Sequence, residues 1–396
     1  MFQTIERRPP DPILGLSAAY KSDTNPNKVD LGVGIYKDEE GNCPVMRAVK
    51  TAEQKLWQIE DSKSYIAQAG PELFLKHSLD LLLGNDHAAV KGKRAAAVLA
   101  PGGSGALRVA AEFVARSFPG TRIFVSDPTW NNHIPLLGSA GLKLELYPYY
   151  DYQKHSIKFD EMMAKLKQAG KGDLVLIHGC CHNPCGADLN HAMWQAVADA
   201  ALKQGFTPFI DLAYQGLGDG LVEDVYGLRL LASQLPEVIV AASASKNFGL
   251  YRERTGTVLV VTETSAATEA AATQVVGTAR EMYSVPPAHG AALVGMILDD
   301  AALRADWDAE LTDMRNRING LRAKLVAKLQ AKGVDRDFSF IQNEKGMFSF
   351  LGLTQEQVKK LIGEYSIYMV GSSRINVAGI NNANIDTLVN AIAAVL

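Results

Sequence analysis

Short apolar runs alternate with amphipathic segments through the middle of the chain. Runs long enough for buried strands lie at 95–99, 122–125, 143–147, 173–178, 206–211 and 238–242, and helical spacing occupies 106–117, 159–168 and 192–203. Parallel strands need a crossover between them, so this alternation is typical of a mostly parallel sheet with helices on both faces. We therefore predict an α/β fold for this region.

The two ends of the chain follow other patterns. Helices are predicted at 13–21, 46–60, 72–83 and 303–330, and a short strand at 29–36 carries Gly32 and Gly34 at alternate positions. The last 50 residues mix short strands and helices, as in a smaller α+β unit. These patterns predict an N-terminal arm of residues 1–30, a large domain of residues 45–300, and a small domain built from residues 31–44 and 301–396.

Composition narrows the class of protein. The 396 residues carry a net charge of −3, which offers no basic surface for nucleic acid. No apolar run approaches the ~18 residues of a membrane helix, and the N-terminal sequence lacks the apolar core of a signal peptide. We expect a cytoplasmic enzyme with neither a nucleic-acid nor a membrane partner.

Three of the four cysteines cluster in one segment. Cys180, Cys181 and Cys185 lie together, with histidines beside them, whereas Cys43 is far away in the sequence. A zinc site is disfavoured, because adjacent cysteines point in opposite directions in an extended segment and no second Cys/His pair follows at zinc-ribbon spacing. We predict reduced thiols and no metal.

The run at 238–242 leads into a lysine, Lys246, with Ser243 and Ser245 beside it. Desolvation lowers the pKa of a buried amine, and a neutral amine can attack a carbonyl carbon to form a Schiff base. The two serines and Arg254 are suited to a phosphate dianion. This combination suggests pyridoxal 5′-phosphate (PLP). Taken alone, a lysine at a strand end is more often a solvated or ion-paired charge.

Other strand ends also carry polar side chains. Asp211 ends one apolar run, and Asn183 follows another. Ligands of parallel sheets bind beyond the carboxyl ends of the strands, so we expect these residues and Lys246 to meet in one crevice. The glycine-rich turn at 101–105 opens a helix and favours an anion there, although a plain tight turn explains the same pattern.

Four motifs then combine. They are His182-Asn-Pro-Cys-Gly186, Asp211-Leu-Ala-Tyr-Gln-Gly216, Ser245-Lys-Asn-Phe-Gly-Leu-Tyr-x-Glu-Arg254 and Asn376-Val-Ala-Gly379. Over nearly its whole length the chain resembles the class I aminotransferases of PLP fold type I, in the aspartate and aromatic amino acid subgroup. The resemblance implies a large domain with a mostly parallel seven-stranded sheet between helices, a smaller α+β domain, and PLP as the cofactor.

The resemblance also implies how matching residues hold the cofactor. Lys246 forms the Schiff base, and Asp211 pairs with the protonated pyridine nitrogen. Asn183 and Tyr214 hydrogen-bond the phenolic oxygen, and Trp130 stacks on the ring. His133 and His178 support Asp211 from behind. The phosphate is held by Gly103, Ser104, Ser243, Ser245, Arg254 and, from a second subunit, Tyr65.

Substrate contacts follow from the same resemblance. Arg374 binds the α-carboxylate, aided by the backbone of Gly34 and close to Trp130 and Asn183. Arg280 of a second subunit reaches the distal carboxylate of aspartate or glutamate. The implied protein is a homodimer whose active sites are shared between subunits, with Lys246, Asp211 and Tyr214 as the catalytic groups.

Three departures from the family pattern concern specificity. Cys185 stands where threonine is common, and we expect only a packing change there. Ser104 and Val285 favour aromatic substrates, whereas the segment at 34–37 looks more like that of aspartate enzymes. We therefore predict transfer from aromatic L-amino acids (Tyr, Phe and also Trp) and L-aspartate to 2-oxoglutarate by a ping-pong mechanism.

Three alternatives stay open at this stage. The first is a strict aspartate aminotransferase. The second is a PLP-dependent β-lyase or decarboxylase on the same fold, against which the paired arginines Arg280 and Arg374 argue. The third is a non-enzymatic regulator with a PLP fold, which the charge and the lack of room for a DNA-binding domain before residue 29 disfavour.

Overall fold

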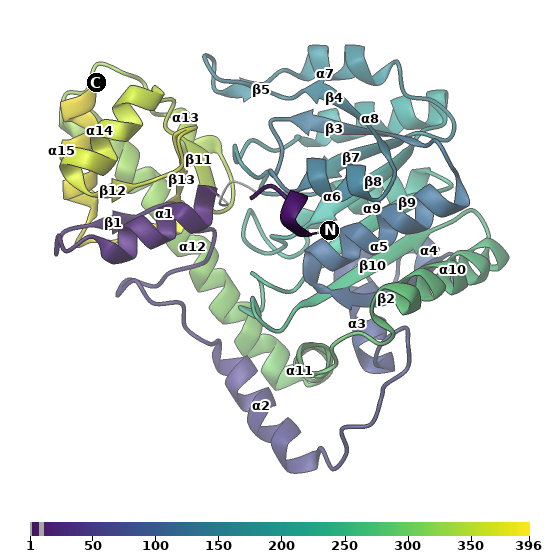
Figure 1. Ribbon diagram of the computed structural model, residues 1–396. Helices are drawn as coiled ribbons and strands as arrows, with labels where there is room; N and C mark the ends of the chain where they lie inside the picture. Colours follow the sequence, from purple (N-terminus) through teal and green to yellow (C-terminus); the bar gives the residue numbers. More distant parts are fainter. Residues whose placement is uncertain (1, 8–11) are drawn as a thin grey trace.

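A central sheet of seven strands organises the part of the chain that the computed structural model describes, residues 2–7 and 12–396 (Figure 1). In spatial order the strands are β2 (Ala95–Pro101), β10 (Thr255–Val261), β9 (Val238–Ser243), β8 (Thr207–Leu212), β7 (Leu174–His178), β3 (Arg122–Asp127) and β4 (Lys143–Pro148). Within this sheet β10 alone runs antiparallel to its neighbours. The predicted seven-stranded, mostly parallel sheet is confirmed.

One strand of the sheet does not appear among the predicted apolar runs. β10 is buried at all of its positions, but β9 reaches it through the loop at 244–254 and not through a helix. A pattern in which strands alternate with helices does not predict a strand that follows another strand without an intervening helix. The loop reverses the chain direction, which is why β10 is antiparallel.

Helices cover both faces of the sheet, as predicted. One face packs on α5 (Gly102–Ser117), α6 (His133–Ser139) and α10 (Ser265–Tyr283). The opposite apolar core includes residues of α2 (Arg47–Ile59), α3 (Glu72–Leu83), α4 (Ala88–Lys91), α7 (Phe159–Leu166), α8 (His191–Gln204), α9 (Tyr226–Gln234) and α11 (His289–Asp299). Side chains alternate between the cores along each strand, so Val98 and Ala100 enter one core and Leu99 the other. Among the described helices, none is both long and apolar enough to cross a membrane.

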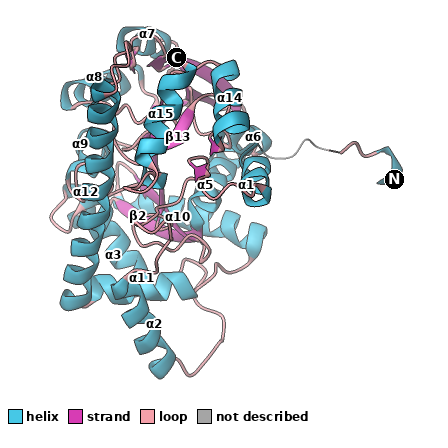
Figure 2. Ribbon diagram, turned by 90° about the vertical axis from the view of Figure 1, so that its left-hand side faces the viewer, coloured by secondary structure: helices cyan, strands magenta, loops and turns pink. Residues whose placement is uncertain are grey.

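A second, smaller unit follows the long helix α12 (Ala301–Ala331), which differs from the predicted helix by two residues at its start and one at its end. It contains β11 (Phe348–Phe350) paired antiparallel with β13 (Arg374–Asn376), and β12 (Ile367–Tyr368) paired parallel with β1 (Val29–Asp30). Its helices are α13 (Phe340–Asn343), α14 (Gln355–Tyr365) and α15 (Ile385–Val395), and α1 (Pro12–Ser22) lies beside them (Figures 1 and 2). The small hairpin β5 (Tyr150–Asp151) and β6 (Ser156–Ile157) and the 3-10 turns Phe2–Thr4, Glu223–Val225 and Val377–Gly379 complete the described elements. The predicted domain boundaries stay predictions, and residues 1 and 8–11 of the predicted arm lie outside the described residues.

The strand predicted at 29–36 is wrong beyond its first two residues. β1 ends at Asp30, and the chain continues as an irregular loop over residues 31–36. Side chains of β13, and not the backbone of a neighbouring strand, form hydrogen bonds with the carbonyls of this loop. Arg374 donates to the carbonyl of Gly32, and the side-chain amide of Asn376 donates to the carbonyls of Val33 and Ile35 at 2.7 Å each. The loop is therefore fixed to the smaller unit.

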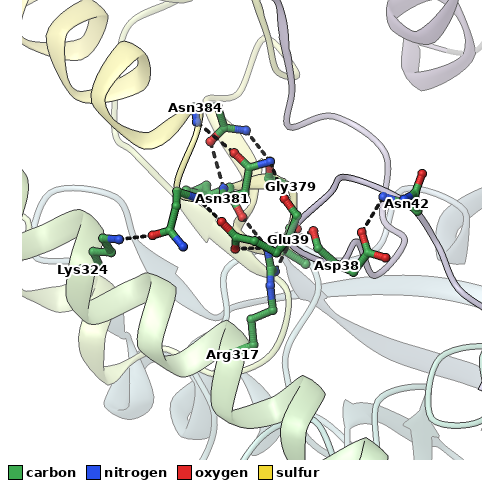
Figure 3. A network of polar contacts seen from close by, with 11 residues as sticks. Asp38, Glu39, Asn42, Arg317, Lys324, Gly379, Asn381 and Asn384 are labelled. Atoms are coloured by element: carbon green, nitrogen blue, oxygen red, sulfur yellow. Dashed lines mark hydrogen bonds and ion pairs between the residues drawn. The ribbon is translucent and has the colours of Figure 1, made fainter.

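A polar network fixes the next stretch of chain in the same way (Figure 3). Arg317 of α12 donates to the carbonyl of Asp38, the carboxylate of Glu39 and the carbonyl of Ile380. Asn381 donates to the carbonyl of Glu39 at 3.0 Å. The segment that follows the loop is thus bonded both to α12 and to the C-terminal end of the chain.

A close backbone contact between the sheet and α5 yields a stability prediction. A Cβ atom on Gly256 of β10 would lie 2.4 Å from the carbonyl carbon and oxygen of Gly102, in the first turn of α5. Gly256→Ala should therefore lower the free energy of unfolding by about 1–3 kcal/mol, the range seen for overpacked cores. Urea unfolding measures the change.

Gly320→Ala is the matched control, because position 320 of α12 is exposed and no atom lies within 4 Å of the added Cβ. It should be neutral or stabilise the protein by up to about 1 kcal/mol through helix propensity. Equal unfolding free energies for the Gly256→Ala variant and the unchanged protein would contradict the steric argument.

Candidate active site

The predicted site residues meet in a cavity of about 250 Å³ at the carboxyl ends of the parallel strands. Of the predicted residues, the cavity is lined by Gly34, Gly103, Ser104, Trp130, His178, Asn183, Asp211, Tyr214, Ser243, Ser245, Lys246, Arg254 and Arg374. β7, β8 and β9 are parallel neighbours, so the residues at their ends share one edge of the sheet. The expected convergence on one crevice is confirmed.

Asp211 is a buried carboxylate held by a histidine. It lies one residue before the end of β8, and its Oδ2 is 2.8 Å from Nε2 of His133, whose Nδ1 is 2.7 Å from the hydroxyl of Thr129. Burial by itself raises the pKa of Asp211, but the hydrogen bond from His133 and nearby positive charge outweigh it, so the pKa lies below its usual value. Asp211 is therefore an anion inside the cavity.

Lys246 brings an amine into the same cavity. It follows the end of β9 by three residues, and its Nζ lies 5.0 Å from the ring centre of Tyr214. Burial lowers the pKa of Lys246 to about 8; Arg254 acts in the same direction, and the charge of Asp211 opposes both. Near neutral pH a useful fraction of this amine is uncharged, as nucleophilic and proton-transfer chemistry requires.

An anion site lies beside the lysine. Gly103 and Ser104 lie in the first turn of α5, which begins at Gly102 and not at residue 106 as predicted, because the glycine-rich turn is itself helical. A Cβ on Gly102 would lie 2.3 Å from Nη2 of Arg254, so glycine is needed for the guanidinium to approach the helix N-terminus. Ser243 donates to the hydroxyl of Ser245 at 3.0 Å in the same place. Guanidinium, hydroxyls and helix N-terminus together favour a phosphate.

Arg374 reaches the cavity from the smaller unit. Its Nη1 is 3.4 Å from Oδ1 of Asn183, and its Nη2 donates to the carbonyl of Gly32 at 2.8 Å. Burial lowers the pKa of its guanidinium, which nevertheless stays charged at any working pH. A planar cation in this position is suited to a carboxylate.

Two aromatic rings complete the wall next to Asp211. Trp130 packs edge-on against His133 at 5.3 Å between ring centres. Burial lowers the pKa of His178 to about 3, so its ring is neutral, and its Nε2 has no hydrogen-bond partner among the residues of the structure. Both histidines expected behind Asp211 are found close to it.

Two predicted residues are absent from this cavity. Tyr65, in the loop between α2 and α3, is 91% exposed, and Arg280, in the last turn of α10, is also exposed. Neither side chain lines the cavity described above. The resemblance places both in the site of a second subunit, and that placement stays a prediction.

Other cavity residues were not predicted. Tyr251 and Phe348 line it, and so do Leu107, Cys180 and Ala213. Tyr251 lies inside the motif that contains Lys246, and its hydroxyl accepts a hydrogen bond from the backbone of Tyr36. Phe348 belongs to a short apolar strand, so its pattern indicates only a core position.

One of the two arguments against a metal at the cysteines, that the side chains of Cys180 and Cys181 point in opposite directions, is wrong. Cys181 has a φ of 51°, so the segment is not extended, and the sulfur atoms of Cys180 and Cys181 lie within 4.8 Å of each other and of a carboxylate oxygen of Asp224. That carboxylate already accepts hydrogen bonds from the backbone of Gly216, Gly218 and Asp219. The prediction that no metal binds there remains a prediction.

Sheet topology and site together define a class, α/β proteins with a buried lysine and a buried carboxylate in one cavity at the carboxyl ends of parallel strands. Comparison with known proteins then gives the family. The model described as "Aminotransferase class I and II" matches residues 26–392, and the chain belongs to this family. It is an aminotransferase of the aspartate and aromatic amino acid subgroup.

Relatives with both substrate names are similar to the chain. It is 48% identical over 396 residues to an aspartate aminotransferase of Escherichia coli K12 and 46% identical to an aromatic-amino-acid aminotransferase of Paracoccus denitrificans, with 100% of each chain covered. A crystal structure of an aromatic-amino-acid aminotransferase from Burkholderia pseudomallei, covalently bound to pyridoxal phosphate, superposes with a TM-score of 0.98 at 41% identity, covering 100% of this chain and 99% of that one.

The pKa of Lys246 predicts how the cofactor-free protein reacts with an aldehyde. Only the neutral amine attacks, so the rate of Schiff-base formation with added PLP should rise with pH and level off above pH 8, because the pKa of Lys246 is lowered to about 8. Stopped-flow absorbance follows the reaction, and borohydride reduction with mass spectrometry identifies the modified lysine. A midpoint near 10.4, the ordinary value for lysine, would contradict the effect of burial.

Proposed function

We propose that this aminotransferase accepts the amino group of aromatic L-amino acids and of L-aspartate and transfers it to 2-oxoglutarate by a ping-pong mechanism with PLP. The observation that carries the proposal is the pairing of a buried amine and a buried carboxylate, Lys246 and Asp211, across one cavity with an anion site beside them. Relatives named for either substrate, at similar identities, support the dual specificity.

The residues of the cavity fit PLP group by group. Lys246 offers the amine for the aldehyde, and the ionised Asp211 offers a counter-charge for a protonated ring nitrogen. Gly103, Ser104, Ser243, Ser245 and Arg254 form the phosphate site. Burial raises the pKa of Tyr214, so its phenol stays protonated and can donate to the cofactor oxygen together with Asn183.

The bound cofactor supplies a ring that withdraws electrons from the substrate and so acidifies its Cα proton. The protein handles that proton. Nζ of Lys246 accepts it as a neutral amine and returns it to a second position, which a pKa of about 8 allows in both directions near neutral pH. His133 keeps Asp211 ionised throughout.

We propose that Arg374 binds the α-carboxylate of every substrate, whereas Arg280 of a second copy binds the distal carboxylate of the dicarboxylates. The exposure of Arg280 and Tyr65 outside the cavity supports an active site that is completed in a homodimer. Trp130 and the backbone of Gly34 would complete the substrate contacts.

We also propose the N-terminal arm, the division into a large and a small domain, and a cytoplasmic location. These three proposals rest on the sequence pattern alone.

A strict aspartate aminotransferase is the second candidate, and the identity to the Escherichia coli aspartate enzyme favours it. Steady-state rates for aspartate, tyrosine, phenylalanine and tryptophan with 2-oxoglutarate decide between the two. Turnover of aspartate without turnover of any aromatic substrate would refute the dual specificity.

Removal of the lysine tests the assignment of the catalytic amine. Lys246→Ala should lower kcat by at least about 10⁴-fold, because both the covalent anchor and the proton carrier are lost. The absorbance band of the Schiff base should disappear in the same variant. A Lys91→Ala variant, which removes an exposed lysine of α4, serves as the control and should keep full activity.

The role of Arg280 predicts a change in specificity. Arg280→Leu should lower kcat/KM for aspartate by about 10²–10³-fold, the cost of truncating one partner of a desolvated charge pair. For phenylalanine, which lacks the distal carboxylate, the change should stay within a few-fold. Equal losses for the two substrates would show that the arginine acts on folding or dimerisation and not on the distal carboxylate.

A further inference from the structure

The guanidinium of Arg374 is buried without a carboxylate partner. Its residue is 6% exposed, and among the described residues no carboxylate forms an ion pair with it. Its partners are neutral: the amide oxygen of Asn183, the carbonyl of Gly32, and the ring of Phe348, whose centre lies 4.4 Å from Cζ of the arginine. Burying a cation in this way is costly unless its surroundings compensate.

Phe348 is held tightly against the arginine. It lies on β11, which pairs antiparallel with the strand that carries Arg374, and the residue is 2% exposed. Its backbone carbonyl accepts a hydrogen bond of 2.7 Å from Arg322 of α12. The ring also meets Tyr214 edge-on, at 6.1 Å between ring centres and 86° between ring planes. These contacts hold the ring beside the guanidinium.

Gly34 shows how close the packing is around this ring. A Cβ on Gly34 would lie 2.7 Å from Cζ of Phe348, so any side chain at position 34 would have to push the ring away. Gly34 has no positive φ that would itself demand glycine. The need for glycine therefore comes from the ring of Phe348.

We propose that Phe348 is a positioning residue for substrate recognition, holding the Arg374 guanidinium through its aromatic face. The inference rests on the proposed binding of the α-carboxylate by Arg374. An aromatic face attracts a cation through its quadrupole but leaves the full charge available. A carboxylate in the same place would neutralise the arginine and compete with the substrate. Phe348 therefore stabilises the buried cation and keeps it free for the α-carboxylate.

Fluorination of the ring tests the proposal with little change of shape. Replacement of Phe348 by 3,5-difluorophenylalanine weakens the negative face of the ring. The probe is 3-phenylpropionate, which has one carboxylate and no amino group, titrated into the PLP-loaded enzyme by calorimetry. We expect the Kd to rise about threefold to tenfold, in line with the size of a desolvated cation–π contact. The PLP affinity should stay unchanged, and the unfolding midpoint should fall slightly, because the ring also stabilises the buried cation in the free protein.

Two further variants separate packing from charge. Phe348→Leu should raise the same Kd at least as much. Phe338→Leu removes the same number of atoms from a buried ring of the smaller unit that faces Arg336, so it should lower stability and leave the Kd within twofold. Gly34→Ala should also raise the Kd, and in the Phe348→Leu background it should add little. An unchanged Kd in the fluorinated protein would overturn the proposal.

Arg374→Leu distinguishes a failure of this inference from a failure of the proposed function. If that variant loses binding of 3-phenylpropionate and fluorination has no effect, then Arg374 binds the carboxylate without help from Phe348. If Arg374→Leu itself binds the probe normally, then the assignment of the α-carboxylate site is wrong, and the inference fails with it.

Discussion

The site depends on keeping an ionised carboxylate and an amine that titrates near neutral pH within one buried cavity. Burial alone would drive both groups to neutrality, since it raises the pKa of Asp211 and lowers that of Lys246. His133 donates a hydrogen bond to Asp211 and keeps it ionised. At Lys246 the charge of Asp211 opposes burial only in part, and the pKa of the amine is lowered to about 8. The same low dielectric thus produces a permanent anion and a proton-transferring amine.

Sheet topology explains why these groups could be found from the sequence. In a parallel sheet every strand ends at the same edge, so polar residues after apolar runs, such as Asp211 and Lys246, must converge there. The rest of the site depends on contacts that the pattern of the chain does not contain. Tyr251 and Phe348 resemble ordinary core residues. The pattern of alternating strands and helices does not predict β10, because a loop and not a helix joins it to β9. It wrongly predicts a strand at 31–36, where the chain is bonded to side chains of β13. The positive φ of Cys181 likewise has no signal in the sequence.

The smaller unit contributes to the site through its contacts with the loop at 31–36. Arg374 and Asn376 of β13 donate hydrogen bonds to four backbone carbonyls of this loop. Three come from side chains, and the fourth runs from the backbone N–H of Asn376 to the carbonyl of Leu31. At the far end of the loop, the backbone of Tyr36 donates to Tyr251, next to the lysine segment. The loop therefore connects the proposed substrate-binding arginine to the proposed cofactor site.

Two buried arginines in the smaller unit and its long helix show how burial can serve structure or function. Arg322 is 1% exposed and faces Glu344 at 3.8 Å, and its Nη atoms donate to several carbonyls around β11, including that of Phe348. Arg374 is almost as buried, but its partners are neutral. The Nε atom has no hydrogen-bond partner in either arginine, so this feature does not distinguish them. They differ in their counter-charge. Arg322 is fixed by Glu344 and several carbonyls and stabilises the fold, whereas Arg374 lacks a negative partner within the described chain. A substrate carboxylate supplies that missing charge, and the free energy of pairing the buried cation then contributes to binding.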